Sequence, residues 1–344
     1  MARPRIDTRL PGLEDAADEA RRLEDLGVDG AFTFEGPHDV FTPLILAAPA
    51  TSSLALATNV AIAFPRNPVQ LAHQAYDLQL LSKGRFTLGL GSQIRTQVVK
   101  RYGADFDRPI ARMRELIAAL RAIFASWELG EPLDFRGEFT SHTLMPPTFN
   151  PGPNPFGPPA LAIGGLGPQM VRLAAEVADG VLVMPFNSAR HFHRRSLPAI
   201  AEGLVHAGRD RTELTVTGEV IVCCGRDEEE LEAARAAGRW LVAFYASTPA
   251  YRPVLEVEGW EQVQPELNML SKSGRWEEMP HMIDDAMLQT LAAVGTPKQV
   301  ATEVLDRFGG EVDRVAFYPP HELSHETLGA LVDELGRIRT DGGP

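Results

Sequence analysis

Cysteine is almost absent from this sequence, since Cys223 and Cys224 are the only two among 344 residues. They are adjacent in the apolar stretch TVTGEVIVCC, and neighbouring side chains of a strand point to opposite faces. No third cysteine completes a spacing typical of metal ligands. We therefore expect two packing thiols in a reducing compartment, with no redox role and no bound metal.

Positive charge and long apolar runs are also lacking. The chain has 33 lysine and arginine residues against 46 aspartate and glutamate residues, a net charge of -13. A nucleic-acid surface needs a clustered basic footprint, so no nucleic-acid partner is expected. No apolar run reaches membrane-spanning length, and Met1 to Pro4 are not followed by an apolar signal stretch. The expected protein is soluble and cytoplasmic, without a membrane partner.

What the sequence has instead is a regular alternation of strand and helix patterns. Strands that are apolar on both faces and alternate with helices are typical of a parallel sheet covered by helices. The eight strand segments are RPRID, VDGAFTFE, LALATNVAIAF, RFTLGLG, PALAIGG, DGVLVMP, LTVTGEVIVCC and DRVAFYP. Eight strand-helix units in a chain of this length predict an α/β fold, a (β/α)8 TIM barrel, as a single domain over residues 1–344.

Two segments interrupt the alternation, at about 130–159 and about 244–295. The first is rich in proline and glycine, and the second contains FYASTPAYRPVLEVEGWEQVQ. Long excursions in a compact domain are usually lids or binding loops, and a dimer-forming insertion is the alternative. Because the site of such a barrel lies at the carboxyl ends of its strands, we expect insertion segments at that mouth.

The segment after the second strand, FEGPHDVF, carries the candidate catalytic residues. Glu35, His38 and Asp39 lie within five residues of one another. A histidine and two carboxylates can supply a proton donor, a base and an orienting partner, so His38 and Glu35 are the predicted proton carriers. The alternative is a helix-entry loop in which Asp39 is a cap.

The fourth strand, RFTLGLG, contains two glycines, Gly89 and Gly91, at a cost in folding entropy. This predicts that another group closely approaches the backbone there. Arg85, at the opposite end of the strand, is expected to be a structural ion-pair or capping residue. Further polar side chains follow the third and fourth strands and are expected at the same mouth. They are Thr58, Asn59, Arg66, Ser92 and Gln93.

The turn after the fifth strand reads IGGLGP and precedes a helix. Glycines between a strand and a helix let backbone N–H groups converge on an anion, and the helix N-terminus favours negative charge. Gly164, Gly165 and Gly167 therefore predict a phosphate site, with a plain tight turn as the alternative. A side chain at Gly165 is expected to occupy the path of the anion.

The sequence also resembles a known family. The segments LAHQAYDLQLLSKGRFTLGLGSQIR, RMRELIAALRAI and PPALAIGGLGPQMVRLAAEVADGVLVMP are similar to the luciferase-like monooxygenase superfamily of flavin and deazaflavin barrels. The segments EGPHDVFTPLILAA, TNVAIAFPRNPVQLA and GEFTSHTLMPPTF resemble its actinobacterial branch of oxidoreductases that use coenzyme F420. The resemblance covers nearly the whole chain, from about Ile6 to Ile338, including both excursions.

The resemblance implies a set of cofactor-binding residues. In relatives the isoalloxazine-type ring lies against a bulge after the third strand, often with a cis peptide, and the fourth strand end lines the ring and ribityl chain. The turn after the fifth strand holds the phosphate. The matching positions are Asn59, Val60, Gly91, Ser92, Gln93, Gly164, Gly165, Leu166 and Gly167.

The chain departs from the deazaflavin-dependent sugar-phosphate dehydrogenases of this superfamily. Those enzymes have an acidic residue after the fourth strand and a lysine after the sixth, where this chain has Ile94 and the turn NSAR. The sixth turn instead continues into ARHFHRR, whose basic residues can meet an anionic cofactor tail or substrate, or form a solvated helix face. They are Arg190, His191, His193, Arg194 and Arg195.

The resemblance thus implies an oxidoreductase that transfers hydride between coenzyme F420 and an organic small-molecule substrate. The alternatives are a two-component FMN-dependent monooxygenase and a flavin- or deazaflavin-binding protein without turnover. Homo-oligomers are frequent in the family, so a homodimer is a further expectation.

Overall fold

The computed structural model describes residues 3–341 and contains a closed barrel of eight parallel strands. Strand β12 pairs with β1, through Val315 opposite Ile6, which closes the ring that β9 and β10 continue on the other side. The predicted TIM barrel is confirmed. Its strands are β1 (Arg5–Arg9), β2 (Gly30–Thr33), β3 (Ala55–Thr58), β5 (Phe86–Gly91), β8 (Ala160–Gly165), β9 (Gly180–Val183), β10 (Thr215–Cys224) and β12 (Arg314–Tyr318).

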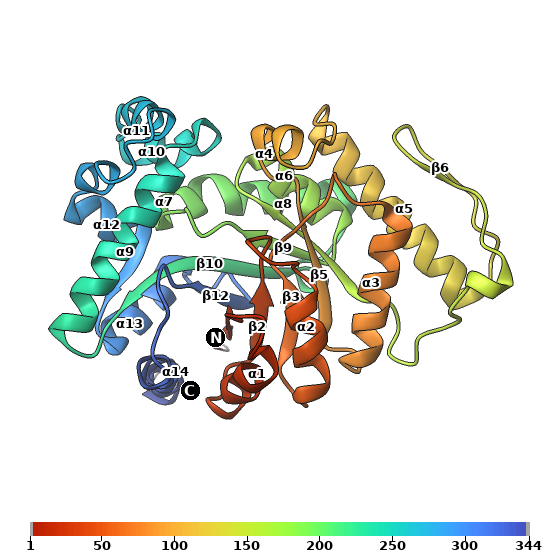
Figure 1. Ribbon diagram of the computed structural model, residues 1–344, viewed down its shortest axis with the longest axis horizontal. Coiled ribbons are helices and arrows are strands. Elements are labelled where there is room, and N and C mark those ends of the chain that lie inside the picture. Colours follow the sequence, from red (N-terminus) through yellow and green to blue (C-terminus); the bar gives the residue numbers. More distant parts are fainter. Residues whose placement is uncertain (1–2, 342–344) are drawn as a thin grey trace.

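Helices surround the barrel, as Figure 1 shows. Local sequence signals begin several of them: Asn67 accepts hydrogen bonds from the first turn of α3, and Thr296 and Gln299 form a capping box on α13. The main helices around the barrel are α1 (Ala16–Asp25), α2 (Thr42–Ala47), α3 (Pro68–Leu81), α5 (Pro109–Leu129), α6 (Pro168–Val177), α8 (Leu197–Ala207), α13 (Pro297–Phe308) and α14 (His325–Asp341).

Several shorter elements lie between these units. The short α-helices α4 and α7 each follow a strand at the mouth, and the single-turn elements connect longer ones. These elements are α4 (Arg95–Lys100), α7 (Ala189–His191), η1 (Ala48–Ala50), η2 (Pro147–Phe149), the π-helical η3 (Phe192–Ser196), η4 (Arg211–Glu213), η5 (Pro249–Tyr251) and η6 (Met279–Met282). Within residues 3–341, no helix is both long and apolar enough to cross a membrane.

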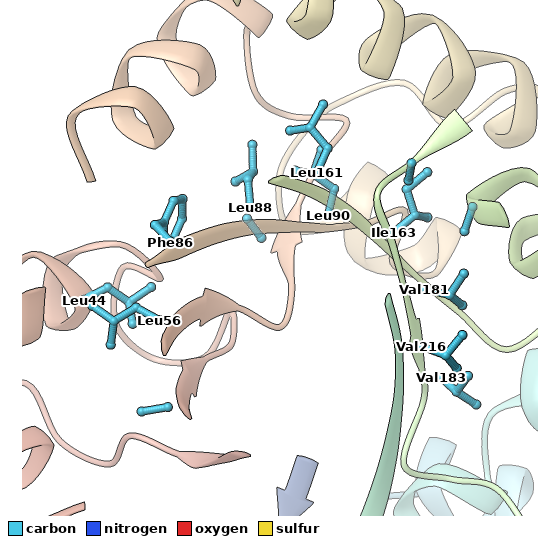
Figure 2. Packing of buried hydrophobic residues seen from close by; sticks show 14 of the residues in the cluster. Leu44, Leu56, Phe86, Leu88, Leu90, Leu161, Ile163, Val181, Val183 and Val216 are labelled. Atoms are coloured by element: carbon cyan, nitrogen blue, oxygen red, sulfur yellow. The ribbon is translucent and has the colours of Figure 1, made fainter. Parts of the chain in front are cut away.

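The main core lies between the strands and the surrounding helices. Along β5 every second side chain is large and faces the helices. These residues, Phe86, Leu88 and Leu90, are at most 2% exposed. Figure 2 shows Leu88 and Leu90 near Leu161 and Ile163 of β8, with which they pair, and Phe86 near Leu44 and Leu56. This period of two leaves the small residues of β5 to face the barrel interior.

The two glycines of β5 allow the neighbouring chain segment to approach. A Cβ at Gly89 would overlap the carbonyl oxygen of Thr58, and one at Gly91 would overlap the side chain of Val60. The Thr58 hydroxyl donates to the Gly89 carbonyl at 2.7 Å and accepts from the Gly89 amide at 2.9 Å. The predicted close approach is confirmed for the protein's own backbone.

The first excursion packs along α5. It contains a hairpin of β6 (Phe135–Arg136) and β7 (Ser141–His142), which Figure 1 shows outside α5. The carboxylate of Glu115 on α5 fastens this hairpin by accepting hydrogen bonds from three successive backbone amides, at 2.6 to 2.8 Å. The segment thereby runs back along the helix that it follows.

The second excursion forms a helical cap beside the mouth. Its helices gather next to α9 in Figure 1, and its last strand, β11, extends the sheet by pairing with the carboxyl half of β10. A second apolar cluster joins this cap to the barrel through Ile221, Leu166 and Phe186. The elements are α9 (Glu228–Ala246), α10 (Arg252–Glu258), α11 (Val263–Lys272), α12 (Asp285–Leu291) and β11 (Ala292–Gly295).

The two cysteines lie at the border of these two cores. Cys223 packs in the cluster of the helical cap, and Cys224 packs in the main core, so adjacent residues serve opposite faces of β10. Both are free and buried. Burial raises the pKa of each thiol to about 12, which keeps both protonated and unreactive at neutral pH. The interpretation as packing thiols is confirmed.

Candidate active site

A cavity of about 390 Å³ lies at the carboxyl ends of the barrel strands. Its wall is built by seven of the eight barrel strands and the segments that follow them, with Tyr245, Ala250 and Tyr251 added by the helical cap and its connection. All nine residues expected to bind a cofactor are among those lining it. They are Asn59, Val60, Gly91, Ser92, Gln93, Gly164, Gly165, Leu166 and Gly167.

The bulge after β3 forms one side of this cavity. The peptide bond between Asn59 and Val60 is cis, as expected from the resemblance, and the Asn59 amide donates to the Thr33 carbonyl at 2.6 Å. The chain resumes pairing with β5 at the two-residue strand β4 (Ala61–Ile62). A Cβ at Gly164 would lie 2.8 Å from the side chain of Val60. Val60 thus reaches across the ends of both β5 and β8, where glycines leave room for it.

The end of β5 turns sharply at Gln93. This residue has φ 55, in the left-handed region that non-glycine residues rarely adopt, and its side chain accepts a hydrogen bond from the Ile94 amide at 2.9 Å. The turn directs the chain into α4 and leaves Ser92 and Gln93 at the cavity wall. Backbone outliers of this kind are concentrated at binding sites.

The glycine turn after β8 meets the amino end of α6. A Cβ at Gly165 would lie 3.2 Å from the side chain of Met170 on α6, so a larger residue there would crowd that helix. The expectation that a side chain at Gly165 would also stand in the path of an anion stays a prediction. At Gly167, the residue preceding α6, φ is -70 and a Cβ would meet no atom within 4 Å. Open space in front of the helix therefore lies at Gly167.

Glu35 lines the cavity, but its carboxylate is already engaged. Arg66 holds it with an ion pair at 2.9 Å and a second contact at 3.1 Å, and the Ile62 amide donates to it at 3.1 Å. The Tyr102 hydroxyl is a further hydrogen-bond partner. These contacts tie the end of β2 to the segment after the bulge.

His38 lies on an exposed part of the same loop and is not among the residues that line the cavity. Its neighbour Asp39 accepts hydrogen bonds from the amides of Phe41 and Thr42 at 3.0 and 2.9 Å. The helix-entry alternative is therefore confirmed for Asp39. A catalytic role of His38 stays a prediction, and this geometry gives it no contact with the cavity.

Glu219 of β10 also lines the cavity, and the motifs of the sequence did not single it out. Its side chain is part of a residue only 6% exposed, and it hydrogen-bonds to the Asn59 side chain. Burial raises the pKa of the Glu219 carboxyl to about 8, against a smaller lowering by Asn59. The carboxyl is mostly protonated at neutral pH and can donate a proton into the cavity.

Aromatic side chains face these groups. Tyr318 of β12 lies 5.6 Å from Phe34 between ring centroids, and Tyr245 lies 5.9 Å from Tyr251. Tyr245 and Tyr318 are hydrogen-bonded to each other, and burial raises the pKa of both hydroxyls. Among the described residues that line the cavity, the charged types are Glu35 and Glu219, and none is basic. Such a wall favours an uncharged, partly apolar molecule.

The basic cluster after β9 is not part of this wall. Arg190 pairs with Glu258 of α10 at 3.2 Å, and His191 is buried against Asn187 with a ring-to-carbonyl distance of 2.8 Å. Burial lowers the pKa of His191 to about 4, so the ring is neutral at physiological pH. Arg194 and Arg195 are exposed and do not line the cavity. The sequence-based alternative of a binding site for an anionic tail therefore receives no geometric support.

The opposite end of the barrel contains a larger cavity, of about 1030 Å³. Its charged groups are engaged with one another, as in the pairs of Arg314 with Asp7 and Arg211 with Asp313. Arg85 lies there and donates to the Ala48 carbonyl at 2.8 Å and to other carbonyls around the end of η1. The interpretation of Arg85 as a structural capping residue is confirmed.

A (β/α)8 barrel with a cavity at the carboxyl ends of its strands, beside a glycine turn that precedes a helix, has the architecture in which many barrel enzymes place their active sites and bind phosphate groups. The chain belongs to the luciferase-like monooxygenase family, whose model matches residues 1–314. Membership in this family makes the protein an oxidoreductase.

Two relatives from Mycobacterium tuberculosis show how far the similarity extends. An uncharacterised protein is 48% identical over 314 residues, 91% of this chain and 92% of its own length. A second protein, provisionally named a coenzyme F420-dependent oxidoreductase, is 30% identical over 301 residues, 81% of this chain and 83% of its own length.

Solved structures show that the fold is shared by enzymes with different cofactors. The coenzyme F420-dependent tetrahydromethanopterin reductase of Methanopyrus kandleri superposes with a TM-score of 0.82 at 20% identity, covering 98% of this chain and 99% of its own. The oxygenating component of 3,6-diketocamphane monooxygenase of Pseudomonas putida, in complex with FMN, gives 0.70 at 16% identity, covering 97% and 98%. At these identities the likeness concerns the fold alone.

Proposed function

We propose that this protein transfers hydride between the deazaflavin coenzyme F420 and an uncharged organic substrate. The observation that carries the proposal is the meeting of nine expected cofactor residues, from three separate strand ends, on one cavity. The Mycobacterium relative named for coenzyme F420 favours the deazaflavin over FMN. The homodimer stays a prediction that light scattering on the purified protein tests.

The residues present fit such a cofactor. The backbone from Gly164 to Gly167, together with the amino end of α6, would hold a phosphate, because this end of a helix favours negative charge and the space before Gly167 is open. The bulge at Asn59 and Val60 would support the ring, and Ser92 and Gln93 would line its edge. When bound, a reduced deazaflavin supplies the hydride, so the task of the protein is to bind and orient.

The substrate would occupy the part of the cavity bounded by Phe34, Tyr245, Tyr251 and Tyr318. This part offers aromatic surface and hydroxyl groups, and no lysine, arginine or histidine lines it among the described residues. An anionic substrate would leave its charge uncompensated there, at a cost that grows with burial. Together with Ile94 and the turn NSAR, this argues against a sugar phosphate.

Gly167→Val is expected to weaken binding of the phosphate-bearing cofactor at least tenfold, because the new side chain would fill the open space before α6. The fold should persist, since φ at Gly167 suits any residue. The matched control is Gly336→Val, at a glycine of α14 whose Cβ would also meet nothing within 4 Å. Titration of both variants by fluorescence measures the effect, and equal affinities would remove this turn from the site.

Comparing coenzyme F420 with FMN tests the assignment itself. We expect F420 to bind with a Kd of about 1 μM or tighter, roughly -8 kcal/mol, and FMN clearly more weakly. Reduced F420 reacts slowly with oxygen, so oxygen consumption should be low. Tight binding of FMN with rapid oxygen consumption in the presence of reduced FMN would instead support the two-component monooxygenase.

The remaining alternative is a carrier without turnover. A carrier would bind one cofactor per chain and transfer no hydride to any acceptor, whereas the proposed enzyme should oxidise reduced F420 repeatedly when aldehydes or ketones are supplied. The absorbance of F420, followed over many equivalents of acceptor, separates the two.

A further inference from the structure

The carboxyl of Glu219 is buried in the wall of the cavity. Its residue is 6% exposed, it lines the cavity directly, and it is hydrogen-bonded to Asn59 at the cis peptide against which the cofactor ring is proposed to lie. A buried acid is costly to a fold, since a hydrocarbon side chain of similar size would pack there without a desolvation penalty. Glu219 therefore invites a functional explanation.

The two residues first predicted to carry the proton are less suited to it. Both oxygens of Glu35 are held by Arg66, and His38 is exposed on a loop outside the cavity wall. Hydride transfer to a carbonyl carbon needs a proton for the oxygen, delivered by a group within hydrogen-bond reach. Of the two carboxyls that line the cavity, only Glu35 forms an ion pair with an arginine within residues 3–341, and Glu219 forms none there.

Resting on the proposed function, we propose that Glu219 is the catalytic acid and base of this enzyme, and that its substrates are uncharged aldehydes or ketones and the matching alcohols. In reduction, hydride from the bound cofactor forms the new C–H bond, and the carbonyl π bond breaks toward oxygen. The O–H bond of Glu219 breaks as its proton joins that oxygen. The substrate gains two electrons, the cofactor loses two, and Glu219 is left as a carboxylate that accepts from Asn59. Oxidation of the alcohol reverses each change.

The surroundings of Glu219 set the pH range of this step. Burial raises the pKa of its carboxyl to about 8, so the acid form predominates at neutral pH. Tyr318 of β12 and Tyr245 of α9 face it with neutral hydroxyls, Glu35 lies on the same cavity wall, and Asn59 comes from the bulge. Reduction should therefore slow as pH rises through about 8, and oxidation should accelerate.

Glu219→Gln tests the proposal with two readouts. We expect the F420 Kd to change less than threefold, because the amide preserves shape and can still accept from Asn59. Turnover of benzaldehyde, cyclohexanone and acetophenone with reduced F420 should fall at least a hundredfold, and the loss of activity near pH 8 should vanish. Infrared difference spectra of the parent should contain a protonated-carboxyl band that titrates near pH 8 and is missing in Glu219→Gln.

The controls separate this inference from the function on which it rests. Thr217 is the residue before Glu219 that faces the barrel interior, and it lines the larger cavity at the opposite end of the barrel. Thr217→Val should therefore retain turnover within twofold of the parent. Failure of the parent to bind F420 would refute the proposed function. Normal F420 binding would refute the inference about Glu219 if any of three results accompanied it: no parental turnover of the three carbonyl probes, less than a tenfold loss in Glu219→Gln, or no titrating band. If the loss of activity near pH 8 vanished in Glu35→Gln or in His38→Ala but persisted in Glu219→Gln, the residue changed in that variant would be the proton donor instead.

Discussion

Gly89→Ala is expected to destabilise the barrel by about 3 kcal/mol or more, the upper range for an overpacked core. The added Cβ would overlap the carbonyl oxygen of Thr58, which is backbone and cannot rotate away. Relief requires β3 and β5 to separate, and this would break the two hydrogen bonds between Thr58 and Gly89. Chemical denaturation followed by circular dichroism measures the loss.

The neighbouring glycine provides the control. At Gly91 an added Cβ would meet the side chain of Val60, which can shift, so Gly91→Ala should cost less than Gly89→Ala. Adding Val60→Ala should restore part of that loss, whereas it should not rescue Gly89→Ala. If Gly89→Ala were as stable as the parent within 1 kcal/mol, the close approach of these strands would not be the reason for glycine.

The barrel could be predicted because its pattern is local and repeated. In RFTLGLG, Phe86, Leu88 and Leu90 mark the face toward the helices, and the intervening small residues mark the interior. Eight such segments, each followed by a helix, leave few topologies for a parallel sheet. The path of the first excursion could not be predicted from such a repeated pattern, because its hairpin is held by Glu115, a single carboxylate on α5.

The cofactor residues could be located because backbone geometry positions them. Gly91 and Gly164 lie at the ends of β5 and β8, Gly167 and the bulge at Asn59 follow strand ends, and the carboxyl ends of all strands in a parallel barrel meet at one mouth. The directions of side chains in loops could not be predicted in the same way. In ARHFHRR, the turn places His191 inward and directs Arg190 to Glu258, a residue 68 positions later. Consecutive basic residues in the sequence therefore do not form one basic surface.

No motif of the sequence predicts Glu219 as a site residue, because TVTGEVIVCC is typical of a mostly apolar strand. Its period of two nevertheless carries a signal, since Thr215, Thr217 and Glu219 share the inward face. Val216, Val220 and Val222 lie on the other face and pack in the main core. A charged residue on the interior face of a barrel strand has to be paired or functional. The tyrosines opposite it could not be predicted, because Tyr245 and Tyr251 reach the cavity only through packing of the helical cap.

The stability of the cofactor-free protein is expected to fall as pH rises from about 5 to 9, with Glu219 responsible for about 4 kcal/mol of the loss at roughly 1.4 kcal/mol per pH unit. The carboxyl loses its proton near its ordinary pKa of 4.5 in the unfolded chain, and near 8 in the folded protein. Between these values unfolding releases a proton. The stability that depends on the protonated form is therefore complete below pH 4.5 and is lost as pH rises through 8.

Other groups also titrate in this range, so the measurement is a difference. His191 acts with the opposite sign, because its pKa is lowered to about 4 and its contribution disappears as pH falls through the range between 6.5 and 4. Comparison of the parent with Glu219→Gln cancels that contribution, since both proteins contain His191. The free energy of unfolding of Glu219→Gln minus that of the parent should increase between pH 5 and 8 and then level off. Parallel curves would mean that Glu219 is ionised in the folded protein, and its role as a proton donor at neutral pH would be wrong.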